Sequence, residues 1–329
     1  MIVDAHRHVI VPEITAAAVP DQWRPSIRVR AAGGRSVVGF RGREINSVTG
    51  EFTDVDVILA EAAATGVDHL LLSPWISLVP VDAPPGDAQL VCSVQNEALA
   101  RLVAAHPRLS AVGAVPLQDP ELAARELPGL AAAGLAGVEI PSSVAGRYLG
   151  DDHFLPFWEA AAGTGALVFI HPTTRGFGIE ALDGYYLWNS AGNPLETAVT
   201  AAHMALAGVL ERFPGLRVLL AHGGGALPVL RGRLRRAYAV RPEASARTAH
   251  GPDWSLRRFY YDSVTHDAAL LAGLIGYAGA EQILLGSDQP FDMGSDNCVA
   301  EVRALGLDEG EELILGGNAE RLLALAAHA

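Results

Sequence analysis

The chain has 329 residues, of which 50% are hydrophobic and 19% are charged, and its mean hydropathy is +0.23. A disordered chain would be poorer in apolar residues, so this composition predicts a folded protein with a large core. The 24 basic and 37 acidic residues leave a net charge of −13, which argues against a nucleic-acid surface or a polybasic membrane patch.

The cysteines and the N-terminus predict a cytoplasmic protein. Cys92 and Cys298 lie far apart and form no C-x-x-C pair, so they offer neither a disulfide framework nor a thiolate zinc site. The first residues lack the basic and apolar regions of a signal peptide. Apolar stretches such as Ala268–Ala280 are too short to span a bilayer.

Short apolar runs alternate with longer amphipathic segments along the chain. We expect strands at Met1–Ala5, His69–Ser73, Leu109–Val115, Gly137–Pro141, Ala166–His171, Arg217–His222, Arg258–Asp262 and Gln282–Asp288. We expect helices at Val55–Thr65, Asp87–Ala105, Pro120–Ala133, Pro156–Thr164, Pro194–Phe213, Leu227–Ala239, Ala268–Ala278 and Cys298–Leu305. This alternation predicts one (β/α)₈ TIM-barrel domain over residues 1–329. An open doubly wound sheet is the alternative, but its glycine fingerprint is missing after the first strand.

Two long segments do not fit a bare barrel. Residues 11–51 separate the first strand from its helix and contain a β-like run at Ser36–Phe40. We interpret them as a small lobe inserted at the catalytic face of the barrel. Thr173–Asn193 is a second long loop, rich in glycine and aromatic residues.

Histidines stand at the ends of the predicted strands. His6 and His8 close the first strand, and their spacing of two places both imidazoles on the same side. His171, His222 and Asp288 end three later strands. Each alone is compatible with a hydrogen-bonded residue at a strand end. Because strand ends converge on one face of a barrel, we instead predict a shared metal site.

The predicted site holds one divalent ion. Its ligands are His6, His8, His171 and Asp288, with water in the open position. His222 would stand beside this water as a base, although it could also be a further ligand.

The residues around these positions resemble a known family. The similar segments are Asp4-Ala5-His6-Arg7-His8, Phe169-Ile170-His171-Pro172, Ala221-His222-Gly223-Gly224-Gly225-Ala226-Leu227-Pro228 and Leu285-Gly286-Ser287-Asp288-Gln289-Pro290-Phe291. They resemble the amidohydrolase superfamily, and within it the α-amino-β-carboxymuconate-ε-semialdehyde decarboxylase branch. The resemblance implies the same four ligands and a water-activating role for His222. It implies a single metal ion, zinc before manganese.

The resemblance also implies residues that bind substrate. Arg43 falls near an arginine that binds the substrate carboxylate, and Trp188 near an active-site tryptophan. Arg233 matches an arginine contributed to the neighbouring subunit's site, which implies a homodimer. From the residues alone, Arg43 could be a solvated loop residue, Arg233 part of a solvated basic helix face, and Trp188 a packing residue.

Together these features predict a metal-dependent, non-oxidative decarboxylase of a small unsaturated or aromatic carboxylic acid. The reaction would use a metal-bound water or a metal-polarised substrate oxygen, with His222 or Asp288 carrying the proton. A lactone or amide hydrolase and a hydratase are alternatives at the same site, because fold alone does not choose the chemistry. A non-catalytic barrel is a further alternative. We expect no nucleic-acid or membrane partner.

Overall fold

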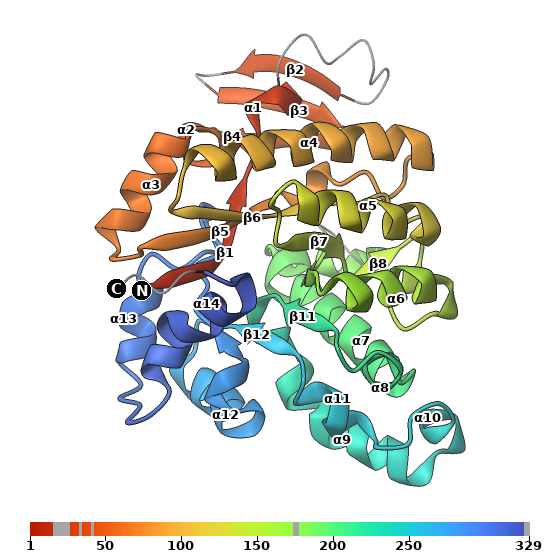
Figure 1. The fold of residues 1–329 in the computed structure, drawn as a ribbon. Coiled ribbons are helices and arrows are strands. Elements are labelled where there is room, and N and C mark those ends of the chain that lie inside the picture. The colour runs from red at the N-terminus through yellow and green to blue at the C-terminus, as the bar shows by residue number, and fades with distance from the viewer. Residues whose placement is uncertain (16–26, 33–34, 41–42, 174–177, 326–329) are drawn as a thin grey trace.

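Eight parallel strands form the central sheet, and helices surround it (Figure 1). The computed structural model describes residues 1–15, 27–32, 35–40, 43–173 and 178–325. In sheet order the strands are β1 (Val3–Val9), β5 (His69–Pro74), β6 (Leu109–Ala114), β7 (Gly137–Pro141), β10 (Leu167–His171), β11 (Arg217–Leu220), β12 (Tyr260–Asp262) and β13 (Ile283–Leu284). The sheet closes because the amides of Ala5 and His8 donate to Leu285 (2.8 Å) and Gln289 (2.9 Å). The predicted (β/α)₈ barrel is confirmed.

The helices begin where the sequence supplies suitable first-turn residues. Asp54, Asp119 and Asp267 accept hydrogen bonds from first-turn amides of α3 (Val55–Ala64), α5 (Pro120–Ala132) and α12 (Ala268–Ala278). Proline, whose missing N–H is harmless there, lies in the first turn of α4 (Pro85–Ala105), α6 (Leu155–Thr164) and α9 (Leu227–Val240). The other α-helices are α1 (Pro12–Thr15), α2 (Gly50–Thr53), α7 (Asn193–Leu206), α8 (Val209–Arg212), α10 (Pro242–Ser245), α11 (Pro252–Leu256), α13 (Cys298–Arg303) and α14 (Asn318–Leu323). None of the described helices is long and apolar enough to cross a membrane.

One expected helix is divided. The pattern over Pro194–Phe213 predicted a single helix, but the structure has α7 and α8 with Gly208 between them. Gly208 has φ +71°, and a Cβ at this position would lie 2.6 Å from the carbonyl oxygen of Arg247. Glycine is therefore required here, and its left-handed conformation ends α7.

A three-stranded antiparallel sheet lies in the segment between β1 and α3. It contains β2 (Ile27–Ala32), β3 (Arg35–Phe40) and β4 (Arg43–Val48), and Figure 1 shows it beyond α4. The β-like run at Ser36–Phe40 corresponds to β3, whereas the sequence pattern did not predict β2 and β4. The boundaries of the inserted lobe, 11–51, stay a prediction. A short hairpin, β8 (Ser143–Val144) and β9 (Arg147–Tyr148), follows β7.

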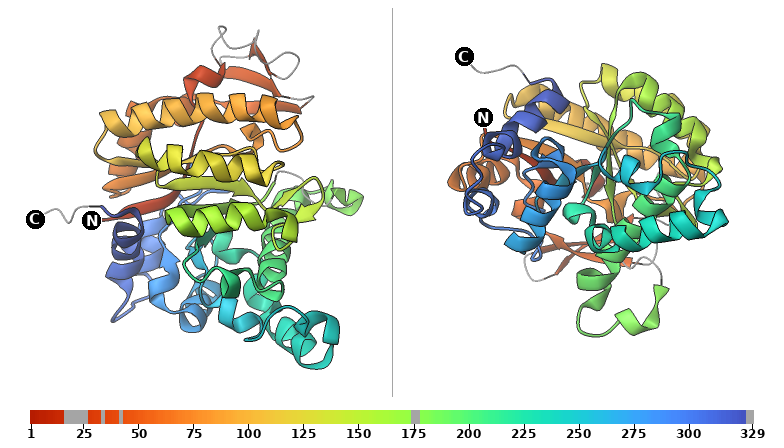
Figure 2. Two further views of the ribbon diagram at one scale, coloured as in Figure 1. Left: turned by 45° about the vertical axis from the view of Figure 1, so that its right-hand side comes forward. Right: turned by 90° about the horizontal axis from the view of Figure 1, so that it is seen from below.

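The strands separate two apolar cores. Residues such as Val138 and Ile140 pack outward against the helices, in the larger buried cluster. Val3, Leu71 and Leu167 belong to a second buried cluster that fills the barrel. Because side chains fill the interior, a functional site can form only at the ends of the strands. Figure 2 shows the ring of helices from two further directions.

Candidate metal centre

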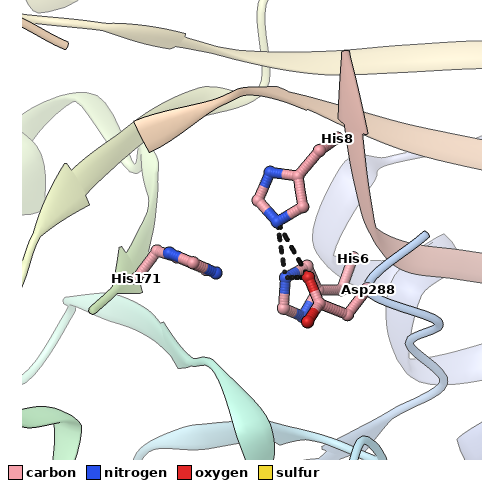
Figure 3. Close-up of side chains that lie close together, drawn as sticks. All are labelled: His6, His8, His171 and Asp288. Atoms are coloured by element: carbon pink, nitrogen blue, oxygen red, sulfur yellow. Dashed lines mark hydrogen bonds and ion pairs between the residues drawn. The ribbon is translucent and has the colours of Figure 1, made fainter. Parts of the chain in front are cut away.

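Three imidazoles and one carboxylate meet at the carboxyl ends of the strands. The potential ligand atoms of His6, His8, His171 and Asp288 all lie within 4.8 Å of one another, and all four residues are buried (Figure 3). The Nε2 atoms of His6 and His8 are 3.0 Å apart. Asp288 Oδ1 lies 3.2 Å from the Nε2 of His6 and 3.1 Å from that of His8. The predicted set of four is therefore brought together.

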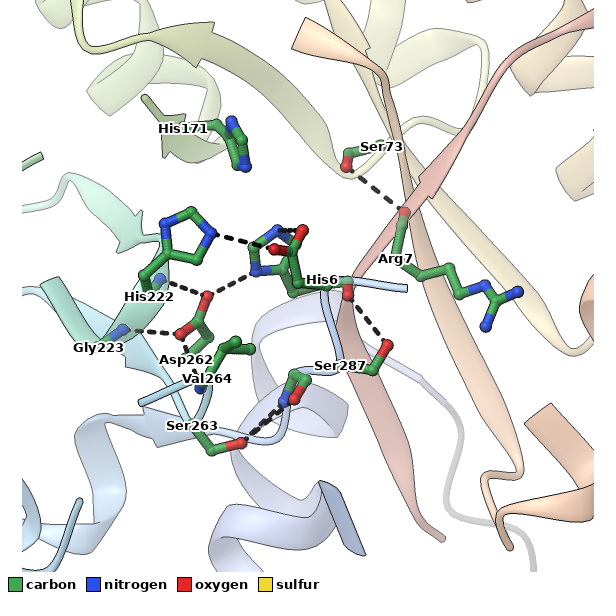
Figure 4. Close-up of polar contacts among 12 residues, drawn as sticks. His6, Arg7, Ser73, His171, His222, Gly223, Asp262, Ser263, Val264 and Ser287 are labelled. Carbon is green, nitrogen blue, oxygen red and sulfur yellow. Dashed lines mark hydrogen bonds and ion pairs between the residues drawn. The ribbon is translucent and has the colours of Figure 1, made fainter. Parts of the chain in front are cut away.

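The backbone of β1 directs two of these side chains inward. The strand register shifts between Asp4 and Arg7, and both imidazoles face the barrel interior. Arg7 points away from the cluster (Figure 4). It pairs with Glu61 on α3 at 2.5 Å. The Asp4 carboxylate accepts hydrogen bonds from the backbone amides of His6 and Ser287, each at 3.0 Å. Asp4 thus joins β1 to the segment that carries Asp288.

The other ring nitrogen of each imidazole is engaged by the protein. The Nδ1 of His6 lies 2.6 Å from Asp262 Oδ2, and that of His8 lies 3.2 Å from Ser73 Oγ. The Nδ1 of His171 lies 3.0 Å from the carbonyl oxygen of Pro172. The carboxylate and the carbonyl require a proton on Nδ1, which leaves Nε2 as the free electron pair that a metal needs.

The donor set fits a divalent cation. His171 Nε2 and Asp288 Oδ1 are buried atoms without a hydrogen-bond partner among the described residues. Buried polar atoms are seldom left unpaired, so these two indicate a missing partner. Three imidazole nitrogens and one carboxylate oxygen suit zinc, and imidazole with carboxylate also suits manganese.

The electrostatics of the cluster are those of a cation site. Burial alone would lower the pKa of His6, but the charges of Asp288 and Asp262 raise it to about 10. Burial lowers the pKa of His8 and takes that of His171 well below its usual range. Burial opposes ionisation of Asp288, yet the adjacent imidazoles hold its pKa well below the usual range. Without a metal ion, a proton on His6 supplies part of the positive charge that a divalent cation would bring to these carboxylates.

His222 lies beside the cluster. It lies two residues beyond the end of β11, with φ +57°, and its Nε2 is 3.2 Å from Asp288 Oδ2. Its Nδ1 is buried and has no hydrogen-bond partner in the described part of the chain. The following Gly225 approaches α7 so closely that a Cβ would lie 2.2 Å from the oxygen of Pro194. The glycine run therefore allows the tight turn that presents His222 to Asp288.

Asp262 connects His222 with the metal cluster, and the sequence interpretation missed it. Its Oδ2 accepts from the backbone amide of His222 (2.8 Å) as well as facing His6. Its Oδ1 accepts from the amides of Gly223 (2.8 Å) and Val264 (3.0 Å), as Figure 4 shows. Asp262 ends its predicted strand, which is the same signal that singled out His171.

Aromatic side chains stand on the His8 side of the cluster and were also missed. The ring of Phe291 meets that of His8 edge-on, with centroids 4.9 Å apart. Phe52 and Trp75 pack against Phe291 at 5.1 and 5.4 Å. These rings form an apolar wall beside the candidate site. They come from three segments that are far apart in the sequence, so no local sequence pattern predicts their contact.

Residues 3–325 match the family profile described as "Amidohydrolase". The chain belongs to the amidohydrolase family. It is 31% identical over 290 residues to a 2-amino-3-carboxymuconate-6-semialdehyde decarboxylase of Dictyostelium discoideum, which covers 86% of this chain and 80% of the relative. The predicted membership of that branch is supported.

Solved structures agree with this amidohydrolase fold. A 5-carboxyvanillate decarboxylase from Sphingomonas paucimobilis superposes with a TM-score of 0.83 and 26% identity over 99% of both chains. A dihydroxybenzoic acid decarboxylase from Polaromonas, solved with manganese and 2-nitroresorcinol, gives a TM-score of 0.80. It covers 99% of this chain and 98% of its own, and its 22% identity supports the fold alone.

The three predicted substrate-binding residues of this amidohydrolase differ in how much of each the structure describes and in their exposure to solvent. The side chain of Arg43 lies outside the described residues, and only its backbone, at the start of β4, is placed. Arg233 is exposed on α9. Trp188 is half-buried at the start of a π-helix, Trp188–Gly192, and meets Tyr186 edge-on at 4.8 Å. The Tyr186 hydroxyl donates to Asp292 (3.3 Å), which lies in the loop after Asp288.

Proposed function

We propose that this amidohydrolase is a metal-dependent, non-oxidative decarboxylase of a small aromatic or unsaturated carboxylic acid. The observation that carries the proposal is the buried cluster of His6, His8, His171 and Asp288, with His222 at 3.2 Å from its carboxylate. The decarboxylases among the relatives and structural neighbours support this chemistry over a lactone or amide hydrolase or a hydratase. The single-domain organisation with an insertion at 11–51 is part of the proposal.

The reaction places one demand on the chain's own residues. The carbon–carboxylate bond breaks, CO₂ leaves, and the electron pair remains on the substrate carbon, which must then receive a proton. A bound divalent ion supplies Lewis acidity at a substrate oxygen. His222 and Asp288 are within hydrogen-bond reach of each other, so they can pass this proton toward the carbon. We assign His222 as the proton carrier and Asp288 as both ligand and partner.

The surroundings of the cluster suit a flat, anionic substrate. The ring of Phe291, packed on His8, offers an apolar face for an aromatic or conjugated system. We propose that Arg43, at the start of β4, and Trp188, at the start of the π-helix, contact the substrate bound in the same chain. Arg233, exposed on α9, would serve the site of a second copy, and the protein would be a homodimer. A planar guanidinium can hold a carboxylate through two hydrogen bonds.

We propose zinc as the natural ion, with manganese as the alternative. The three imidazoles favour zinc, while the manganese in the Polaromonas neighbour supports the second choice. We also propose a cytoplasmic location, supported by two free, buried cysteines that take part in no disulfide.

The test is CO₂ release by the purified protein. We would assay a panel of carboxylated phenols and muconate-type acids beside lactones and amides, after loading with zinc or manganese. We expect CO₂ from at least one carboxylated compound and about one equivalent of metal per chain. Hydrolysis of lactones or amides without CO₂ release would refute decarboxylation. Metal content far below one equivalent, unchanged by added zinc or manganese, would instead favour a non-catalytic barrel.

A further inference from the structure

A buried carboxyl group that the proposed reaction does not use lies inside the barrel. Glu139 occupies the middle of β7, between Val138 and Ile140, whose side chains belong to the outer apolar core. Because side chains alternate along a strand, Glu139 faces the barrel interior. It is fully buried, and neither carboxylate oxygen has a hydrogen-bond partner among the described residues.

The neighbours of Glu139 on the adjacent strands are apolar. In the strand register, Ala114 of β6 and Phe169 of β10 stand opposite it. The interior below is filled by side chains such as Val112 and Leu167. Burial raises the pKa of Glu139 well above its usual range. A carboxyl group without any partner in such a setting is unfavourable, so it indicates an interaction with a group other than its neighbours on the strands.

The metal cluster lies immediately above this position. Pro141, two residues beyond Glu139, pairs in register with the ligand His171. Phe169 opposite Glu139 meets the His6 ring edge-on, with centroids 4.8 Å apart. The charges of His6 and Asp288 both act on the Glu139 carboxyl. Glu139 is thus one inward-facing position below the ring of candidate ligands.

We propose that Glu139 is a positioning residue of the metal centre: it holds ordered water beneath the cluster, and its negative charge, unfavourable in the empty site, is stabilised by a bound divalent ion and in turn favours that ion. This inference rests on the proposed metal site. Glu139 is not one of the four residues whose ligand atoms cluster within 4.8 Å, so it acts through this water and through charge. A water between this carboxyl group and the imidazoles above it would have the polar partners that buried water needs in proteins.

The test compares metal affinity with the stability of the metal-stripped protein. We would prepare Glu139→Gln, which removes the charge, and Glu139→Met, which removes the polar group while keeping an unbranched chain. Zinc affinity would be measured by competition with a chromophoric chelator. We expect both variants to bind zinc about 10–100-fold more weakly. The melting temperature of metal-stripped Glu139→Met should equal or exceed that of the wild type, because a buried carboxyl group with no hydrogen bond to the protein has gone.

Glu211→Gln is the matched control. Glu211 lies on α8, ahead of the start of β11 and so at the opposite end of the barrel, and accepts from the amides of Ala249 and His250. This variant should lose stability but bind zinc like the wild type.

Three results would overturn the inference. Zinc affinity of Glu139→Gln within about twofold of the wild type would exclude a role of the charge. A fall in the metal-stripped melting temperature of both Glu139 variants, matching the loss of affinity, would show a purely structural role. If the wild type itself bound no metal, the proposed function would fail together with this inference. Wild-type binding with unchanged variants would refute the inference alone.

Discussion

Replacing Asp262 by asparagine should weaken metal binding and stability together. The carboxylate faces four donors: the Nδ1 of His6 and the amide of His222 at Oδ2, and the amides of Gly223 and Val264 at Oδ1. Asparagine has one acceptor oxygen, and its NH₂ group would face two donors in either orientation. The substitution is nearly isosteric, so the loss comes from hydrogen bonding rather than from packing.

The size of the effect follows from the donors left unpaired. Two buried donors without an acceptor cost about 2–6 kcal/mol, at about 1–3 kcal/mol each. If the imidazole of His6 also loses its orienting carboxylate, metal affinity should fall about 10–100-fold, equivalent to about 1.4–2.8 kcal/mol. We expect metal-stripped Asp262→Asn to have a lower melting temperature than the metal-stripped wild type. We also expect it to have a larger zinc dissociation constant, measured by chelator competition.

Asp4→Asn is the control for this prediction. Asp4 is also a buried carboxylate that accepts backbone hydrogen bonds from His6 and Ser287, but it makes no hydrogen bond to an imidazole among the described residues. It should lose stability with a smaller change in metal affinity. Equal losses of affinity in the two variants would refute the argument that Asp262 acts by fixing the His6 ring. Wild-type affinity in Asp262→Asn would refute it as well.

Three further predictions concern the ligands and the arginines. His171→Ala should lose both the bound metal, in metal analysis, and the activity, in turnover assays. His222→Ala should keep most of its metal while its kcat falls about 10²–10⁴-fold. If His222→Ala lost as much metal as His171→Ala, His222 would be a ligand. Because the pKa of His6 is about 10, zinc must displace its proton, so affinity should rise about tenfold per pH unit from pH 7 to 9. His6 stabilises the metal-stripped fold fully below pH 6.5, and that contribution fades as the pH rises toward 10; a flat affinity profile would contradict the assignment. Arg233→Ala should raise KM most for dianionic substrates, while Arg235→Ala, whose side chain pairs with Asp253 at 3.4 Å, should leave KM unchanged; equal effects would argue against a substrate role for Arg233.

The barrel and the cluster could be predicted because two simple regularities coincide. Apolar runs mark the strands, and polar residues at their carboxyl ends mark the face where barrels gather their functional groups. His171 ends β10 in the structure as in the sequence. Asp288 lies beyond β13, but its amide still donates to the carbonyl of His6 at 2.8 Å, which keeps it beside β1.

Other features depend on spatial contacts that a single sequence does not contain. Glu139 interrupts an apolar strand, and nothing in its local pattern shows that both oxygens lack partners. Phe52, Trp75 and Phe291 come from three distant segments of the chain and meet only in the folded protein. Gly208 separates α7 from α8, and only glycine fits there because the carbonyl of Arg247, which is distant in the sequence, lies so close. Asp262 differs from these, since its position at a strand end was visible.

The hydrogen bonds between Asp4 and Ser287 join residues 283 positions apart. The cluster likewise combines histidines from the first strand with a carboxylate that follows the last. A chain emerging from the ribosome therefore has its first two imidazoles early but acquires Asp288 only near the end of synthesis. The full set of four ligands therefore exists only once the barrel has closed. A chain truncated before Asp288 would lose the carboxylate ligand together with the hydrogen bond from the His8 amide to Gln289 that helps to close the barrel.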